Sequence, residues 1–137
     1  MSSAVTLIDT SSWIEALRVS GDKEVRERVR SLMLDGFAAW CDMVAVELWH
    51  GARGDYEKKV LAEMEKEITC LPTTGGVWRL ARDLARRCRT EGRTVPAADL
   101  VIASCAFFHD VRIEHCDGNL DFILSVRKPK RLGAGRV

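Results

Sequence analysis

The 137-residue chain lacks the features that mark membrane, secreted disulfide-rich or zinc-binding proteins. No apolar run approaches the roughly 18 residues that a membrane span needs, and the N-terminus has no basic signal segment. The five cysteines form an odd set without a C-x-x-C pair, which argues against a disulfide framework. The three histidines have no metal-binding spacing with these cysteines. We therefore expect a cytoplasmic protein that has no membrane partner.

Charge is distributed unevenly along the chain, although the formal net charge is only +1. The last eleven residues hold five basic and no acidic side chains, so the first 126 residues carry a net charge of −4. A chain of about 150 residues buries roughly 70% of its unfolded surface and forms one ordinary domain. The sequence therefore predicts a single domain over residues 1–126 and a basic C-terminal tail over residues 127–137.

Short apolar segments alternate along the chain with longer segments of helical periodicity. Strands are expected at residues 5–8, 37–41, 68–71 and 111–116. Helices are expected near residues 12–19, 25–33, 42–53, 56–67, 76–91, 96–108 and 122–126. Strands that alternate with helices form parallel sheets with right-handed connections and helices on both faces. The predicted fold is a three-layer α/β/α arrangement around a central, mainly parallel sheet.

The first helix carries its own start signal. Ser12 and Glu15 have the spacing of a capping box, in which each side chain satisfies a free backbone N–H near the other. This pattern predicts that the helix begins at about Ser12. It also predicts that Trp13, Ile14 and Leu17 face the core.

Four acidic side chains stand where α/β proteins place their chemistry. Asp9 and Asp117 each end a predicted strand, and the carboxyl ends of parallel strands meet at one edge of the sheet. Asp99 lies in the first turn of a predicted buried helix, and Glu47 borders the buried face of another. Taken singly, each acid has a structural explanation as a turn residue, a helix cap or a charge beside a helix dipole.

Taken together, the acids favour a metal site. Carboxylates that lie close together repel one another and raise each other's pKa unless a cation compensates. An all-oxygen cluster without histidine or cysteine suits a hard ion such as Mg²⁺ or Mn²⁺. Such an ion lowers the pKa of a bound water and orients a phosphate group. The residues therefore favour metal-dependent hydrolysis of phosphodiester bonds.

The segments that carry these acids resemble the PIN-domain ribonucleases, in particular the VapC-type toxins of toxin–antitoxin pairs. They read IDTSSWI at residues 8–14, VELxxGAR at residues 46–53, ADLxIA at residues 98–103 and CDxxxDF at residues 116–122. The four motifs follow the family's order, and the resemblance covers residues 5–126. It implies the PIN fold and an endoribonuclease activity.

The resemblance further implies a ligand set and a mechanism. One or two Mg²⁺ or Mn²⁺ ions would be held by the four acids, Asp9, Glu47, Asp99 and Asp117. A metal-bound water would attack an RNA phosphate and leave a 5′-phosphate and a 3′-hydroxyl group. Thr10 or Ser11 would lie beside the metal, as a hydroxyl ligand or as a donor to one of the ligands.

The fourth acid departs from the spacing that is usual in the family. The family commonly has phenylalanine about three residues after its last acid, whereas Phe122 follows Asp117 by five. Asp121 is therefore an alternative fourth ligand, and Asp117 is preferred because it directly ends the predicted strand. Asn119 is a further candidate near the site.

Basic side chains offer a surface for RNA. Five arginines recur every three or four residues opposite the apolar face of the helix expected at residues 76–91: Arg79, Arg82, Arg86, Arg89 and Arg93. Such a stripe can follow a nucleic-acid backbone, because phosphate contacts need positive charge more than sequence detail. It can equally be a solvated helix face. The basic tail has the same two interpretations, with antitoxin contact as a third.

The resemblance also implies protein partners, because a toxin must be silenced. It implies a small antitoxin whose C-terminal segment lies across the cleft and whose charge opposes the metal site. It implies as well that the toxin forms a homodimer within the toxin–antitoxin complex.

Two other functions remain open at the level of sequence. A phosphatase of the haloacid dehalogenase type would use Asp9 as a covalent nucleophile, but that chemistry wants a second aspartate where Ser11 stands. A catalytically inert PIN-like module that binds RNA or protein is the other alternative. The four intact acids argue against such a module.

Overall fold

The computed structural model describes residues 3–127, so residues 1–2 and nearly all of the predicted basic tail lie outside the described part. The strands are β1 (Ser3–Ile8), β2 (Ala38–Cys41), β3 (Thr69–Leu71) and β4 (Val111–Glu114). The helices are α1 (Thr10–Leu17), α2 (Lys23–Leu34), α3 (Asp42–Gly51), α4 (Gly54–Glu67), α5 (Gly75–Thr90), α6 (Ala97–Phe108) and α7 (Gly118–Arg127). Within residues 3–127, no helix is long and apolar enough to cross a membrane.

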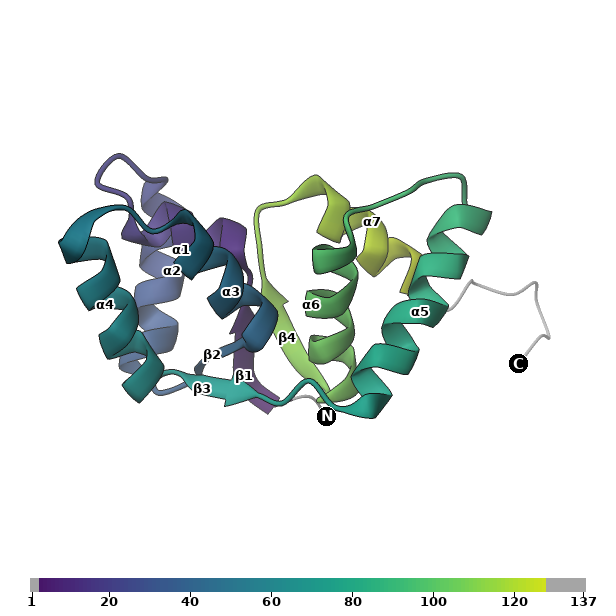
Figure 1. Ribbon diagram of the computed structural model, residues 1–137, viewed down its shortest axis with the longest axis horizontal. Helices are drawn as coiled ribbons and strands as arrows, with labels where there is room; N and C mark the ends of the chain where they lie inside the picture. The colour runs from purple at the N-terminus through teal and green to yellow at the C-terminus, as the bar shows by residue number, and fades with distance from the viewer. Residues whose placement is uncertain (1–2, 128–137) are drawn as a thin grey trace.

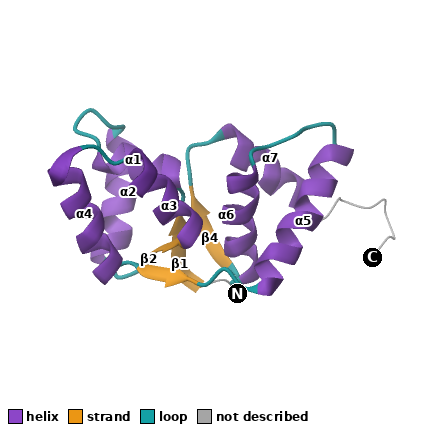
Figure 2. Ribbon diagram, viewed as in Figure 1, coloured by secondary structure: helices purple, strands orange, loops and turns teal. Residues whose placement is uncertain are grey.

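The four strands form one parallel sheet in the order β3-β2-β1-β4 (Figure 2). β1 lies in the interior of the sheet, where Leu7 is in register with Ala39 of β2 and with Ile113 of β4. The chain moves to one side of β1 for β2 and β3 and to the other side for β4. The strand order therefore reverses between β1 and β4, and ligands of α/β proteins bind outside the carboxyl ends of strands at such a point.

Helices cover the sheet in a three-layer α/β/α arrangement, as the sequence predicts. α2 contacts β1 and β2 and packs on α1, whereas α3 contacts β2, α6 contacts β4, and α3 and α6 contact each other. α5 and α7 pack on α6. Figure 1 shows α1 to α4 on one side of the view and α5 to α7 on the other, with β4 between the two groups.

The core consists of two clusters that meet at β4. One cluster contains Leu7, Trp13 and Trp40 and also includes residues of α5 and α6 such as Ile102, and the other contains Leu84 and other apolar residues of α5, α6 and α7. Ile113 is half-buried and packs against both clusters. Packing across β4 therefore joins the two groups of helices.

The predicted start of the first helix is wrong, because Asp9 and not Ser12 is the N-cap of α1. Ser12 is fully buried and its hydroxyl donates to Glu114 at 2.9 Å. Glu15 does not complete a capping box, since its Oε1 accepts a hydrogen bond from the backbone N–H of Asp22 at 2.8 Å. The carboxylate of Asp9 caps the helix by accepting from the backbone N–H of Ser11, whereas the hydroxyl of Ser12 is engaged with Glu114.

Two of the three residues predicted to face the core from this helix do not. Trp13 is buried, but Ile14 and Leu17 are 40% and 45% exposed. The buried face of α1 is formed by Ser12 and Trp13, whereas Ile14 and Leu17 line a surface groove. These two apolar side chains therefore line the groove and are not part of the core.

The last strand ends at Glu114 and not at Cys116. The backbone N–H of Asp9 donates to the carbonyl oxygen of Glu114 at 2.9 Å, and this bond closes the pairing of β1 with β4. The N–H of Cys116 donates instead to the hydroxyl of Ser11 at 3.1 Å. Asp117 therefore lies three residues beyond the strand, so the reason for preferring it as a strand-ending acid is wrong.

Candidate active site at the carboxyl ends of β1 and β4

Asp9 links the central strand to the first helix. The residue is only 2% exposed, and its Oδ2 accepts from the Ser11 backbone N–H at 3.0 Å and from the Ser11 hydroxyl at 2.6 Å. As the N-cap of α1, the carboxylate stands beside the partial positive charge of a helix N-terminus. Its other oxygen, Oδ1, is buried and has no hydrogen-bond partner within residues 3–127.

Glu47 approaches this position from α3. It is half-buried, as expected for a residue at the border of the buried helix face. Its Oε1 accepts a hydrogen bond of 2.6 Å from the hydroxyl of Thr10 in the first turn of α1. Thr10 and Ser11 thus each hold the carboxylate of a predicted site residue, Glu47 and Asp9 respectively.

Asp99 lies in the first turn of α6 and is 8% exposed. Burial raises the pKa of its carboxyl group to about 6, and repulsion by Asp117, Asp9 and Glu47 adds to the rise in pKa. A hydrogen bond from Asn119 opposes that rise. The shift shows that the structure brings together four carboxylates that are far apart in sequence, hereafter the acid cluster: Asp9, Glu47, Asp99 and Asp117.

The structure distinguishes Asp117 from Asp121. The Oδ1 atom of Asp117 accepts from the backbone N–H of Asn119 at 2.6 Å, and its charge acts on Asp99. The side chain of Asp121 is 76% exposed and lies 3.5 Å from Nε2 of His115. Asp121 is not among the groups that raise the pKa of Asp99. Asp117 therefore belongs to the acid cluster and Asp121 does not. The role of Asp117 as the fourth metal ligand stays a prediction.

Glu114 supports the site and was missed in the sequence. This last residue of β4 accepts from Ser12 Oγ at 2.9 Å and from Nε of Arg28 in α2 at 2.8 Å. Its backbone carbonyl accepts from Asp9. A signal for it was present, because Glu114 is an acid next to Ile113 in an alternating strand. These contacts join α1, α2 and β4 next to the backbone of Asp9.

The acid cluster has the chemistry of a divalent metal site. Oδ1 of Asp9, a buried carboxylate oxygen without a partner among residues 3–127, is an electron-pair donor that would suit a hard cation. Within residues 3–127, however, no three acidic, histidine or cysteine side chains stand at the spacing of ligands to one ion. Mg²⁺ commonly binds through one or two carboxylates and keeps several waters. The residues therefore fit an ion with a partly hydrated shell.

The five arginines of the predicted stripe do not all lie on one helix in the structure. Four of its members are exposed on α5: Arg79, Arg82, Arg86 and Arg89. Arg86 pairs with Asp83 at 2.5 Å, and Arg89 donates to the hydroxyl of Thr94 at 3.1 Å. Arg93 follows α5 and reaches the candidate site, where it donates to Oδ1 of Asn119 at 2.7 Å. RNA binding by these arginines stays a prediction.

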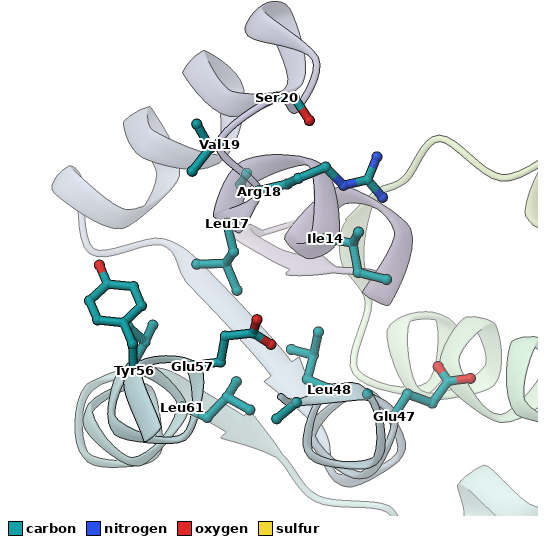
Figure 3. Close-up of a pocket in the computed structure, with 14 residues that line it drawn as sticks. Ile14, Leu17, Arg18, Val19, Ser20, Glu47, Leu48, Tyr56, Glu57 and Leu61 are labelled. Atoms are coloured by element: carbon teal, nitrogen blue, oxygen red, sulfur yellow. The ribbon is translucent and has the colours of Figure 1, made fainter. Parts of the chain in front are cut away.

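A groove of about 760 Å³ lies between α1, α3 and α4. Its apolar lining includes Ile14, Leu17 and Leu48, and Glu47 of the acid cluster also lines it. Figure 3 shows the groove with Tyr56 and Glu47 on opposite sides of the view and Leu17 between α1 and the helices facing it. The groove is therefore continuous with the candidate site.

The chain matches known proteins over most of its length. The PIN domain family matches residues 6–123. The chain is 33% identical to Ribonuclease VapC11 of Mycobacterium tuberculosis over 124 residues, which cover 88% of this chain and 92% of that protein.

Solved structures show the same fold. FitAB bound to an IR36 DNA fragment has a TM-score of 0.72 and 23% identity, over 87% of this chain and 90% of that one. VapBC2 from Rickettsia felis, bound to a DNA fragment from its promoter, has a TM-score of 0.63 and 14% identity, over 82% and 99%. The family match, the fold and the position of the acid cluster agree. The chain belongs to the PIN-domain family, and its similarity to VapC11 places it among the VapC ribonucleases.

Proposed function

We propose that this protein is an endoribonuclease dependent on Mg²⁺ or Mn²⁺ and the toxin of a type II toxin–antitoxin pair. The observation that carries this proposal is the acid cluster at the reversal of strand order between β1 and β4. Relatives named as VapC ribonucleases support RNA as the substrate. Such an enzyme would meet its RNA substrate in the cytoplasm, which is the location expected from the sequence.

In this proposal the four acids hold the cation. Asp9 offers its Oδ1, which has no partner in the described part of the chain, while Ser11 fixes Oδ2 of the same carboxylate. Thr10 holds Glu47 through a 2.6 Å hydrogen bond. A bound cation would offset the repulsion that raises the pKa of Asp99. When bound, the metal would lower the pKa of a water and orient the scissile phosphate.

The antitoxin is proposed to occupy the groove between α1, α3 and α4. The exposed apolar side chains of Ile14 and Leu17 have no core partner to explain them, and they lead toward Glu47. An antitoxin segment with apolar residues and a cationic side chain would fit this lining. The structural neighbours FitAB and VapBC2 are complexes, which supports a protein partner. A toxin homodimer within that complex is part of the same proposal.

The test is cleavage of a short labelled RNA by the purified full chain with Mg²⁺ or Mn²⁺, and with chelator. We expect cleavage that needs the metal and leaves a 5′-phosphate. Asp9→Asn and Asp99→Asn should each reduce cleavage by roughly 100-fold or more, because each removes a charged ligand. Cleavage that persists in chelator would overturn the proposal.

A matched pair of variants tests the fourth ligand in the same assay. Asp117→Asn should lose activity, whereas Asp121→Asn should keep it within a few fold, because Asp121 is exposed and outside the acid cluster. The opposite result would assign the role to Asp121. RNA binding without any cleavage would favour the inert PIN-like module. Release of inorganic phosphate from small phosphate esters would favour the phosphatase.

A further inference from the structure

Side chains hold the connection from β4 to α7 that carries Asp117, because strand pairing has already ended at Glu114. The backbone N–H of Cys116 donates to the hydroxyl of Ser11 at 3.1 Å. The next N–H along the chain, that of Asp117, donates to Nδ1 of His115 at 3.2 Å. The position of Asp117 therefore depends on a serine hydroxyl and on a histidine ring.

Two further polar atoms of Asp117 are bound within its own segment. Its carbonyl oxygen accepts from the backbone N–H of Asp121 at 3.1 Å. Its Oδ1 atom accepts from the backbone N–H of Asn119 at 2.6 Å. These bonds leave Oδ2 as the carboxylate oxygen that Asp117 can offer to a cation. The orientation of that oxygen follows from the backbone position of Asp117, to which the bond from its N–H to His115 contributes.

The hydrogen bond from Asp117 also assigns the tautomer of His115. A backbone N–H can only donate, so Nδ1 of His115 is the acceptor and carries no proton. The proton of the neutral ring is then on Nε2, which lies 3.5 Å from Oδ1 of Asp121. The side chain of His115 is only 11% exposed. The ring is therefore enclosed between the backbone of Asp117 and the carboxylate of Asp121.

We propose that His115 is a positioning residue that places Asp117 for cation binding, and that Asp121 acts through His115. This inference rests on the proposed metal-dependent function. The ring of His115 accepts the N–H of Asp117 and so fixes the backbone that carries the carboxylate. A carboxylate that faces Nε2 keeps the ring proton on that nitrogen, so that Nδ1 stays an acceptor. Asp121 thus contributes to the site without being a ligand.

The first test measures Mn²⁺ binding to the full chain by titration calorimetry, with two substitutions that separate the acceptor of His115 from its bulk. Asparagine carries its amide oxygen on Cγ, the atom that carries Nδ1 in histidine, whereas glutamine carries it one bond further out. His115→Gln should weaken Mn²⁺ affinity by about tenfold, because loss of a group that orients a ligand commonly has that effect. His115→Asn should recover most of the affinity. Equal losses in both variants, or no loss in either, would overturn the inference.

Asp121→Asn tests the second half of the proposal in the same titration. It should weaken Mn²⁺ affinity by less than His115→Gln does, because the ring stays in place when its carboxylate partner is lost. Added to His115→Gln, it should cause no further loss, because Asp121 acts through His115. Additive losses would overturn the role of Asp121.

His109→Gln is the matched control. Nε2 of His109 lies 2.7 Å from the carbonyl oxygen of Pro72, so this imidazole also contacts a backbone group. It stands at the C-terminal end of α6, whereas Asp99 lies in the first turn of that helix. The control should leave Mn²⁺ affinity unchanged. A loss equal to that of His115→Gln would overturn the inference.

A second measurement needs neither metal nor RNA. Hydrogen exchange followed by NMR should show a protected Asp117 N–H in the wild type and in His115→Asn, and faster exchange in His115→Gln, which lacks the acceptor. The same exchange rate in all three proteins would overturn the inference even in an active nuclease. Protection that depends on His115, in a wild type that neither binds Mn²⁺ nor cleaves RNA, would overturn the proposed function and support the contact.

Discussion

Asp99 combines two properties that rarely coincide in one side chain: it is a charged group, and it is 8% exposed. Its carboxyl group faces three other acids, and burial together with their charge raises its pKa from 3.8 to about 6. Without a cation, ionisation of Asp99 therefore opposes folding. The arrangement of the acid cluster therefore costs stability, as is common at functional sites.

This gives a pH-dependent prediction for Asp99→Asn in the presence of chelator. The folded pKa lies above the unfolded pKa, so the wild-type protein loses stability as the pH rises from about 4 to above 6. At pH 7 the variant should be more stable by on the order of 1 to 3 kcal/mol, because one pKa unit corresponds to about 1.4 kcal/mol. Thermal unfolding at pH 4 and pH 7 measures the difference. A gain of the same size at both pH values would contradict the prediction.

At the scale of secondary-structure elements, the turn from α1 to α2 leaves no room for a side chain at Gly21. A Cβ atom at Gly21 would lie 1.8 Å from the backbone oxygen of Glu15 and 2.7 Å from its carbonyl carbon. Backbone atoms cannot move aside as a flexible side chain can. Glu15 also accepts from the N–H of Asp22, so this turn fixes how α1 leads into α2.

Gly21→Ala should therefore reduce the free energy of unfolding by roughly 1 to 3 kcal/mol, the usual effect of adding atoms to a packed site. Chemical denaturation of the purified variant measures this loss. Gly51→Ala at the end of α3 is the control, because no atom lies within 4 Å of its added Cβ. The control should be neutral or slightly stabilising. Equal effects at the two positions would show that the close approach at Gly21 is not what matters.

The same scale shows what could be predicted from the sequence. The buried run at residues 6–8 and the helical periodicities predict strands and helices locally, and the alternation predicts a parallel sheet. The start of α1 could not be predicted, because Asp9 with Ser11 and Ser12 with Glu15 are both good capping patterns. The choice between them depends on Glu114, which is distant in sequence and contacts Ser12.

Only part of the candidate site could be predicted from the sequence, because the rest depends on contacts between residues that are distant in sequence. Asp9 and Asp99 follow from position along their own elements, and Glu47 follows from the helix period. The place of Asp117 depends on where β4 stops pairing, which the Ser11 hydroxyl decides by taking the N–H of Cys116. The bridge from Arg93 to Asn119 depends on how α5 and α7 pack, which no local pattern contains.

At the scale of the whole molecule, the groove between α1, α3 and α4 and the acid cluster share Glu47 but otherwise use different residues. Partner binding and catalysis should therefore be separable by mutation. Leu17 is 45% exposed in the groove and is not part of the acid cluster.

Leu17→Asp should accordingly weaken binding of the cognate antitoxin while RNA cleavage persists. An acidic side chain on the apolar lining must be desolvated when a partner covers it. In a bacterial host, the variant should still arrest growth, and co-expression of the antitoxin should no longer relieve the arrest. Full relief by the antitoxin would place its main contact elsewhere.

The strand order has a consequence for how the protein is made. β1 leaves the ribosome long before one of its two neighbours, β4, which begins only at Val111. Until that segment is synthesised, one edge of β1 stays unpaired, and Asp9 lacks its backbone bond to Glu114. A translating ribosome therefore carries an incomplete site until β4 has been made. Chains that terminate before Val111 would be inert fragments, and the proposed nuclease would first exist once β4 and the segment that follows it have been made.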